Sequence, residues 1–333
     1  HSTRNDGARF DYDSISTFSS VASAAMQDYY NQLGMQTSFN AYSYYGHTPL
    51  TAAMFSVKYE FTDNTPSLPT NMTEVGSQTY STGNNAASTV HLYEYNNTLP
   101  LGFMVNMSTE ANWNKETGNP FTTQNSFVKT AIDSDANIFH QLQTTDTVGT
   151  FTAKYQLEED DNYKPSGDAA TYDVYFYCVT SSETLTVNIT NGSITDDNST
   201  TKTFSSTNQN YICHVGNVSA GSTITVTASD GQALTTCYAY AFDNDAWETA
   251  YKLLNKNPYT VESYSDTKIT GKVTAKKQGI MYTSIPYDKG WNVYVDGVKS
   301  KTTSICSGAL TGVLVEAGTH EITFKYTPKG LVP

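Results

Sequence analysis

Charged side chains are scarce in this sequence. Asp, Glu, Lys and Arg make up 15% of its 333 residues, whereas they make up about 25% of an average soluble domain. Asn, Ser, Thr and Tyr take their place. The 25 tyrosines favour strands, because tyrosine fits a half-buried pleated surface. The composition is therefore typical of a β-rich secreted protein and not of a cytosolic α/β enzyme.

Long apolar runs and clusters of basic residues are also missing. No apolar stretch reaches the roughly 18 residues that a membrane-spanning helix needs, and no signal peptide is recognisable. The formal net charge is −13 and no stripe of Lys and Arg interrupts it, which excludes a nucleic-acid partner. With 333 residues the chain exceeds what one hydrophobic core usually serves, so we expect two or three domains.

The sequence has none of the short motifs that carry common chemistries. Its six histidines form no H-x-H, no H-E-x-x-H and no pair within one helical turn, so we predict no metal site. Glycine-rich nucleotide motifs and a G-x-S-x-G elbow are absent as well, so we predict no cofactor and no nucleophilic serine. The acidic run from Glu158 to Asp161 is consecutive rather than alternating, which indicates a solvated loop instead of a calcium site.

A pair of carboxylates for glycoside hydrolysis could still come from distant segments of the chain. Asp11, Asp13 and Glu60 are the candidates, although an Asp in such a place more often solvates a surface or caps a turn. We therefore predict no catalytic residue in this chain.

The four cysteines, Cys178, Cys213, Cys237 and Cys306, have no C-x-x-C spacing. Zinc binding and thioredoxin-type chemistry are therefore excluded. The first three lie within or beside aromatic or aliphatic strands, where small buried thiols usually occur. A disulfide among those three is compatible with the spacing, but the sequence does not choose the pairing or the oxidation state of any of the four.

Residues 1–147 mix helix and strand patterns, so we predict an α/β domain. Ser19 or Ser20 can cap a helix that runs to Leu33 and is stopped by Gly34. A short helix is expected after Thr48, with proline in its first turn. Residues 62–83 read as a loop because they are rich in Pro, Thr and Asn. The other elements expected here are strands over 57–61, 90–95 and 101–105 and a helix over 121–132.

Residues 148–258 predict an antiparallel β-sandwich that ends in a bridging helix. Short strands recur every ten to twenty residues, with Gly, Asn or Asp between them. Asp243 or Asn244 then caps a helix in which Trp247 and Leu254 fall on one face, and Asn257-Pro258 ends it. The strands are expected over 151–155, 172–178, 185–189, 211–215, 223–226 and 237–242.

Residues 259–333 predict a second antiparallel sandwich. Trp291, Val293 and Val295 alternate with polar residues, and Asp296-Gly297 supplies the positive φ angles of a two-residue hairpin. Further alternating strands lead to Pro328, which ends the series. We expect Trp291 to be a buried anchor of this core. The predicted fold class is thus mainly β: two antiparallel sandwiches that follow an α/β domain.

Several phrases, in this order, resemble the YfhO family of bacterial polytopic membrane proteins. The phrase over 280–331, IMYTSIPYDKGWNVYVDGVKSKTTSICSGALTGVLVEAGTHEITFKYTPKGL, resembles the C-terminal extracellular segment that precedes the last membrane helix of that family. The resemblance covers nearly the whole chain and is weakest over 150–241. The other phrases that carry it lie at 5–7, 14–20, 44–49, 57–59, 99–104 and 119–121.

The resemblance implies an extracellular part of a C-type glycosyltransferase-like protein in a Gram-positive cell envelope. Such a protein takes a polyprenyl-phosphate sugar donor and a glycopolymer acceptor such as teichoic acid. The resemblance also implies flanking transmembrane helices of the same chain as partners, with residues 1–147 proximal to the membrane and both ends of the chain on one face. The catalytic carboxylate of that class lies in an early loop, so we expect this fragment to be accessory and not catalytic alone. A protein-binding or scaffolding sandwich ectodomain is the alternative.

An uncharged, aromatic and Asn-rich region near the N-terminus is the candidate glycan contact. It comprises Asn5, Asp6, Tyr44, Tyr45 and His47. Tyrosine rings suit the apolar face of a sugar, and amides suit its paired hydroxyls. The same tyrosines could instead pack in a turn against a neighbouring helix. If they meet substrate, Tyr44 and Tyr45 should be partly exposed and close to Asn5 and Asp6.

Overall fold

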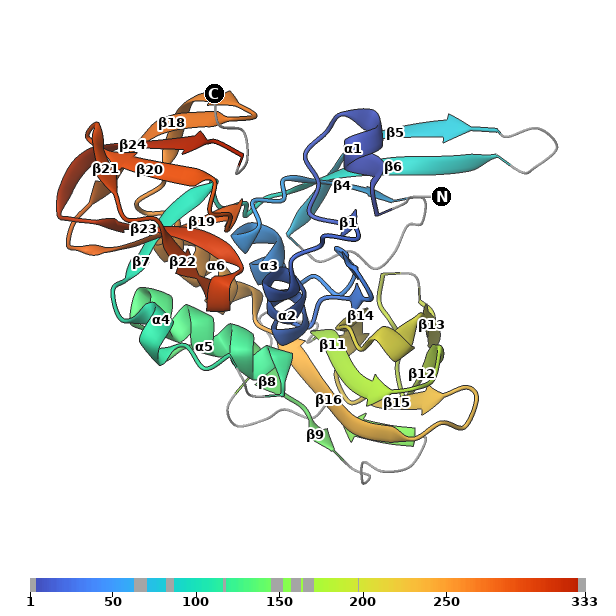
Figure 1. The fold of residues 1–333 in the computed structure, drawn as a ribbon. Helices are drawn as coiled ribbons and strands as arrows, with labels where there is room; N and C mark the ends of the chain where they lie inside the picture. The colour runs from blue at the N-terminus through green and yellow to red at the C-terminus, as the bar shows by residue number, and fades with distance from the viewer. Residues whose placement is uncertain are drawn as a thin grey trace.

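The computed structural model describes residues 4–62, 71–81, 87–115, 118–144, 152–156, 163, 171–196 and 198–328. Antiparallel strands dominate this part of the chain and form six sheets, while the helices are few and short. The predicted mainly β fold class is therefore confirmed. In Figure 1 α2 and α3 lie near the centre, between the C-terminal sheets, the N-terminal hairpin and the middle sandwich, while α4 and α5 lie along the lower edge.

The N-terminal segment forms three short helices and a small sheet. The second helix begins later than predicted, because Ser19 and Ser20 belong to a turn that precedes it. Its cap is Ser23, whose hydroxyl accepts a hydrogen bond from the amide of Met26. Gly34 follows the helix with a φ of +80°, as the sequence predicts. The elements are α1 (Asp6–Phe10), β1 (Thr17–Phe18), α2 (Ala24–Gln32), β2 (Thr37–Ser38), β3 (Ala41–Tyr42) and α3 (Pro49–Met54).

A three-stranded sheet follows, formed by β4 (Tyr59–Thr62), β5 (Met72–Tyr80) and β6 (Ser88–Tyr95). The prediction of a loop over 62–83 was wrong for Met72–Tyr80, which pairs with β6 along its whole length. Cross-strand pairing is not local, so it overrides the weak strand propensity of this segment. The hairpin projects from the rest of the molecule in Figure 1.

The two longer remaining helices lie where the sequence predicts them, whereas the sequence does not predict the short one that precedes them. Asn119 caps α5 (Pro120–Ile132), which has proline at its first position, and Asp243 caps α6 (Asn244–Leu254). Both side chains accept backbone amides of the first turn, which satisfies donors that the helix itself leaves unpaired. The short α4 (Thr109–Asn112) precedes α5.

The middle of the chain forms two sheets that face each other. Their strand orders are β13-β12-β15-β10-β9 and β14-β11-β16-β8. Alternate residues of β11 point into the core between them, which includes Val174, Phe176 and Cys178. The strands are β8 (Phe139–Gln141), β9 (Gln143–Thr144), β10 (Thr152–Gln156), β11 (Thr171–Thr180), β12 (Thr184–Thr190), β13 (Thr201–Ser205), β14 (Cys213–Ser219), β15 (Thr223–Ala228) and β16 (Leu234–Phe242).

A disulfide joins two neighbouring strands of this sandwich. Cys178 of β11 and Cys237 of β16 are direct partners in the ladder, with their Cα atoms 4.1 Å apart. Cys213 and Cys306 are free and buried. The structure therefore selects one of the pairings that the sequence left open.

The C-terminal part forms the orders β17-β18-β24-β20-β21 and β22-β23-β19-β7. Asp296 and Gly297 have φ angles of +50° and +78°, which confirms the predicted hairpin between β20 and β21. The strands are β7 (Gly102–Asn106), β17 (Thr260–Ser265), β18 (Lys268–Ala275), β19 (Gly279–Pro286), β20 (Trp291–Val295), β21 (Val298–Ser300), β22 (Thr303–Ile305), β23 (Leu310–Val315) and β24 (Gly318–Tyr326).

Trp291 is not the buried anchor that the sequence predicts. It is only partly buried and packs at the edge of the core, against Phe324 and Tyr326. Val293 takes the central place on that strand and is fully buried. Trp291 is the first residue of β20, so its ring covers the end of the sheet and does not enter it.

A central core connects the segments. It combines residues of α2, α5 and α6 with Tyr175 and Tyr177 of β11 and with Tyr282 of β19. β7 pairs with β19, although more than 170 residues separate them. The division into units at residues 147 and 258 remains a prediction. The described helices include none long and apolar enough to cross a bilayer.

Backbone contacts hold the N-terminal segment against the middle sandwich. The amide of Ile212 donates to the carbonyl of Gly34 at 2.8 Å. A Cβ on Gly46 would lie 2.4 Å from the same carbonyl oxygen and 2.9 Å from Cβ of Tyr211. Both glycines also have positive φ angles, so no larger residue fits this contact without displacing the backbone.

Candidate functional site

The predicted glycan contacts surround the small N-terminal sheet, but they play different parts. Asn5 bonds to both backbone groups of Phe18, at 2.8 and 2.9 Å, and so fixes the edge of β1. Asp6 begins α1. The amide of Tyr44 donates to the hydroxyl of Ser16, two residues before Phe18. The structure therefore brings the two segments together through β1, while Asn5 itself serves the backbone.

Tyr44 and His47 belong to a polar network, not to an open surface. Their rings stack with centroids 3.9 Å apart, and Nδ1 of His47 lies 3.1 Å from the carbonyl oxygen of Tyr44. The Tyr44 hydroxyl donates to Tyr95 at 2.6 Å, and the Tyr95 hydroxyl donates to Glu60 at 3.0 Å. Nε2 of His47 lies 3.4 Å from the same carboxylate. This arrangement holds the turn before α3 against the sheet of β4 and β6.

Burial governs the protonation of this network. Desolvation lowers the pKa of His47, and the neighbouring His214 acts in the same direction, while Glu60 and the Tyr44 carbonyl oppose them. Burial also raises the pKa of Tyr44 and of Tyr95 well above the usual range. The imidazole is therefore neutral and the phenols are protonated near neutral pH.

A second histidine–carboxylate pair lies on the sandwich side. Nε2 of His214 is 2.6 Å from Oδ1 of Asp173, and the imidazole stacks on the ring of Tyr175 at 4.4 Å. Asp173 is 2% exposed. Four sequence-distant segments thus contribute Glu60, Tyr95, Asp173 and His214. No local sequence motif contains them, so the sequence alone could not predict that these four residues lie close together.

Tyr45 faces solvent and provides the open part of the site. Its side chain is 61% exposed, and its ring lies 6.4 Å from the ring of the half-buried Tyr211. Beside this pair, the guanidinium of Arg4 donates to Gln209 and Gln36 at 3.0 and 3.2 Å, and to Ser38 at 2.8 Å. The amide of Gln36 donates to the carbonyl of Tyr45 at 2.8 Å, and Gln209 lies two residues before Tyr211. Arg4 therefore joins the two backbone segments that carry the aromatic rings. We call Tyr45, Tyr211, Arg4 and Gln209 the aromatic seam.

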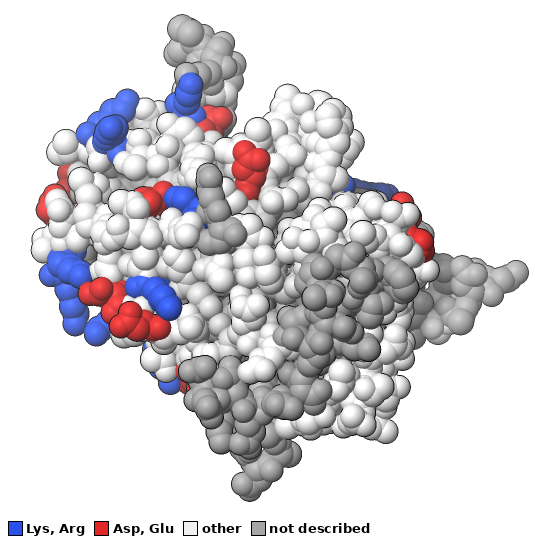
Figure 2. Space-filling model, turned by 90° about the horizontal axis from the view of Figure 1, so that it is seen from below, with Lys and Arg blue, Asp and Glu red and all other residues white. Residues whose placement is uncertain are grey.

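The surface around the seam is poor in charge. Between Ser14 and Val57 the single Asp, Glu, Lys or Arg is Asp28. Charge is also uneven on the face seen from below in Figure 2, where most of the blue and red side chains gather on the left and the remaining described surface is largely white. An anionic polymer would be repelled least where acidic groups are scarce.

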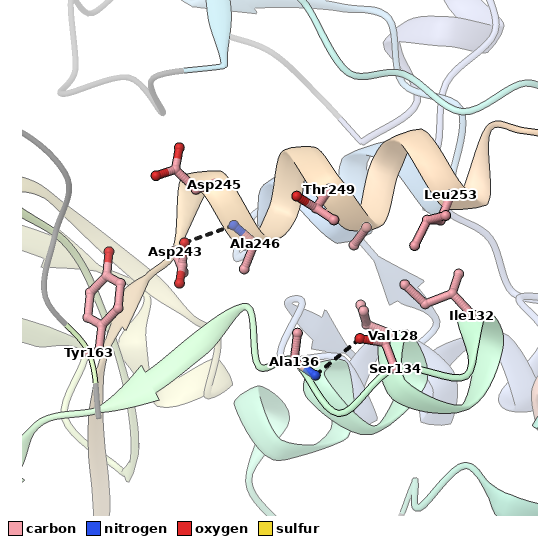
Figure 3. Close-up of a pocket in the computed structure, with 11 residues that line it drawn as sticks. Val128, Ile132, Ser134, Ala136, Tyr163, Asp243, Asp245, Ala246, Thr249 and Leu253 are labelled. Carbon is pink, nitrogen blue, oxygen red and sulfur yellow. Dashed lines mark hydrogen bonds between the residues drawn. The ribbon is translucent and has the colours of Figure 1, made fainter. Parts of the chain in front are cut away.

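A cavity of about 330 Å³ lies between α5 and α6 (Figure 3). Its apolar side includes Val128, Ile132 and Leu253, and its polar side includes Tyr163, Asp243 and Asp245. Asp243 is occupied by the amide of Ala246 at 2.9 Å and by Nε2 of His140 at 3.2 Å. Burial raises the pKa of this carboxyl, but those two contacts outweigh it and the pKa lies below its usual value.

Tyr163 is also engaged, because its hydroxyl donates to the carbonyl of Phe242 at 3.2 Å and its ring stacks on His140. Two of the polar side chains at the cavity, Asp243 and Tyr163, thus already bond to other groups of the protein. We therefore assign the cavity no ligand.

The three carboxylates considered for glycoside hydrolysis, Asp11, Asp13 and Glu60, have different surroundings. Glu60 holds the Tyr95 and His47 network, and Asp11 follows α1 with a φ of +58°. Asp13 is exposed. The acidic run over 158–161 lies outside the described residues. In the part of the chain that the structure describes, no group of three or more His, Cys, Asp or Glu side chains is arranged to hold a metal ion.

Comparisons with known proteins give one informative match. No curated protein matches the chain. The crystal structure of quercetin 2,3-dioxygenase from Acinetobacter baumannii aligns with 58% of this chain and 79% of that chain, with 10% identity and a TM-score of 0.13. A likeness that weak carries no argument about fold or chemistry. The family model described as "Bacterial membrane protein YfhO" matches residues 1–333. The chain therefore belongs to the YfhO family of bacterial membrane proteins.

Proposed function

We propose that this chain is an extracytoplasmic, glycan-facing part of a cell-envelope glycosyltransferase-like membrane protein. In this proposal it is accessory and does not catalyse sugar transfer by itself. Its neighbours are the membrane helices of its own chain, and its ligand is a lipid-linked sugar or a glycopolymer such as teichoic acid. The aromatic seam is the observation that carries the proposal.

The extracytoplasmic placement is supported by the disulfide between Cys178 and Cys237. Disulfides form and persist in oxidising compartments and are rare in the reducing cytosol. The family match supports the membrane association. Together they favour a domain that meets the outer face of the cell membrane.

Sugar recognition at the seam is supported by its chemistry. An exposed tyrosine ring offers an apolar face to the C–H groups of a pyranose, and a neighbouring ring can cover a second sugar unit. The guanidinium of Arg4 is an always-charged donor that suits hydroxyl or phosphate oxygens. A poly(glycerol phosphate) chain with sugar substituents would use both features.

Calorimetric titration with teichoic-acid fragments and with the matching neutral oligosaccharides tests this proposal. We expect binding that Tyr45→Ala weakens about three- to tenfold, since a stacked ring contributes on the order of 1 kcal/mol. Tyr45→Phe keeps the ring and should bind normally. Tyr59→Ala is the matched control, because Tyr59 is 46% exposed on a different sheet.

The same titration separates the rival functions. Absence of binding to every glycan would favour a protein-binding or scaffolding role for the sandwiches. A second measurement, sugar transfer from a polyprenyl-linked donor by the chain alone, addresses the accessory role. Sustained turnover there would overturn it.

A further inference from the structure

Three apolar side chains project into solvent at one edge of the small N-terminal sheet. Phe39 is 88% exposed, Val21 86% and Phe18 56%. Single exposed hydrophobic residues are common on protein surfaces. It is less common for a phenylalanine and a neighbouring valine both to be almost fully exposed. Groups of exposed apolar side chains mark interaction sites. We call these three residues the apolar tips.

Hydrogen bonds bring the tips together. Phe39 lies in the two-residue turn between β2 and β3, next to Asn40, which has a φ of +56°. The amide of Ser19 donates to the carbonyl of Asn40 at 3.0 Å, and the amide of Ala22 donates to Ser19 at 2.9 Å, which closes the turn that carries Val21. Phe18 pairs with Ala41 in the same sheet. The two turns are therefore neighbours, although Val21 and Phe39 are 18 positions apart in the sequence.

The sheet that carries the tips is anchored in the core. The Tyr30 ring packs on Tyr42 with centroids 4.7 Å apart, and the Tyr30 hydroxyl donates to the carbonyl of Ile15 at 2.6 Å. Tyr30 is fully buried. Asn5 also clamps both backbone groups of Phe18. These contacts fix the backbone that carries the tips, so the tips are exposed although their segment is well packed.

The charge around the tips restricts what they can contact. The chain carries a net charge of −13, yet Asp28 is the single Asp, Glu, Lys or Arg between Ser14 and Val57. Arg4 donates to the Ser38 hydroxyl next to Phe39, and Asp6 follows the Asn5 that bonds to Phe18, so one basic and one acidic residue flank this edge. An anionic bilayer repels the protein as a whole, and this edge, with little net charge, adds little to that repulsion. Side chains that project this far into solvent also suit a fluid surface, since a protein partner would need a matching pocket.

We propose that the apolar tips insert into the interfacial layer of a lipid bilayer. Phenylalanine is among the apolar side chains with which membrane-surface segments enter the boundary between headgroups and acyl chains. The proposal shares with the proposed function the membrane-facing placement of residues 1–147, but it does not depend on glycan binding at the aromatic seam. The tips thereby set the orientation of this segment on the membrane.

Tryptophan reporters on the 333-residue chain test this proposal. Phe39→Trp places a fluorophore at the tip, and vesicles of phosphatidylglycerol and phosphatidylethanolamine provide the bilayer. A polyhistidine tag and a nickel-chelating lipid keep the chain at the surface whether or not the tips bind. We expect a blue shift of the Phe39→Trp emission and quenching by brominated acyl chains, relative to the unsubstituted chain. Val298→Trp is the control, because Val298 is 71% exposed in the hairpin of β20 and β21 and should show neither change.

Partitioning of the untethered chain into the same vesicles provides the second test. Val21→Ser with Phe39→Ser should lower the partition coefficient about tenfold or more, whereas Val298→Ser should leave it unchanged. Both substituted sites are solvent-exposed, and an unchanged melting temperature confirms that the variant folds. Equal quenching of both tryptophan reporters would overturn the proposal. So would dimerisation of the unsubstituted chain that the double variant abolishes, because the tips would then join two copies.

Discussion

Several of the polar side chains near the N-terminus have well-defined structural tasks. Asn5 clamps Phe18, and Tyr44 links His47 to Tyr95. Tyr45 is the member of the predicted set whose side chain is largely free to meet a ligand, at 61% exposure. The sequence points to this region because aromatic and amide residues are frequent there. It could not separate Tyr44 from Tyr45, since partners such as Tyr95 come from a distant strand.

Two tryptophans should respond differently to truncation. Trp247 is 1% exposed in the central core, whereas Trp291 is partly buried at a sheet edge. Trp247→Ala should lower the free energy of unfolding by about 3–5 kcal/mol, and Trp291→Ala by about 1–2 kcal/mol. Urea unfolding followed by circular dichroism measures both. Equal losses would show that the end of β20 is packed more tightly than its burial indicates.

His47 should make the folded state less stable in mild acid. Burial lowers its pKa in the folded protein, so between about pH 6.5 and that lower value the unfolded state binds the proton more readily. Stability therefore falls as the pH falls through this window. His47→Gln should make the stability profile between about pH 5 and 7 shallower, as measured by urea unfolding at a series of pH values. Tyr95→Phe keeps the imidazole buried and should preserve the slope.

At the scale of elements, local signals predict helices better than strands. Thr48-Pro49, Asn119-Pro120 and Asp243 mark the starts of α3, α5 and α6, because a cap and a first-turn proline act within a few residues. β5 was missed because its partner β6 supplies the stabilisation from another segment. The cap of α2 was misplaced for a related reason: the backbone of Ser19 bonds to Asn40 and closes a separate turn.

The disulfide between β11 and β16 should contribute strongly to stability. It closes a loop of 59 residues, for which the chain-entropy estimate is about 4 kcal/mol as an upper value. Reduction should lower the urea midpoint of the native chain and leave a Cys178→Ala, Cys237→Ala variant unaffected. A native midpoint that does not change under reductant would mean that the two thiols are unpaired in solution.

At the scale of the molecule, residues far apart in the sequence share cores. β7 lies between the N-terminal segment and the C-terminal sheet and pairs with β19 over five residue pairs. Phe103 of β7 is fully buried and packs near Tyr282 of β19. Composition and periodicity predicted three successive units, but they could not reveal a strand that one segment contributes to the sheet of another.

A chain that ends at residue 258 should therefore not behave as a folded monomer. Without β19, the β7 edge and the apolar surface around Phe103 face water, which favours edge-to-edge association. Light scattering after size exclusion should show aggregates for this truncation and a single monomeric species for the full chain. A monodisperse truncated chain with native-like near-ultraviolet dichroism would argue that the N-terminal and middle segments fold independently of the C-terminal sheets.

Gly34 and Gly46 fix the backbone spacing across the aromatic seam. They bring the backbone of the N-terminal segment against Tyr211 and Ile212 with no side chain of their own in between. The spacing between Tyr45 and Tyr211 therefore depends on main-chain atoms that every substitution of the surrounding side chains leaves in place. Single substitutions in the seam can consequently change which ligand it prefers in the course of evolution, while the backbone spacing between its two rings stays the same.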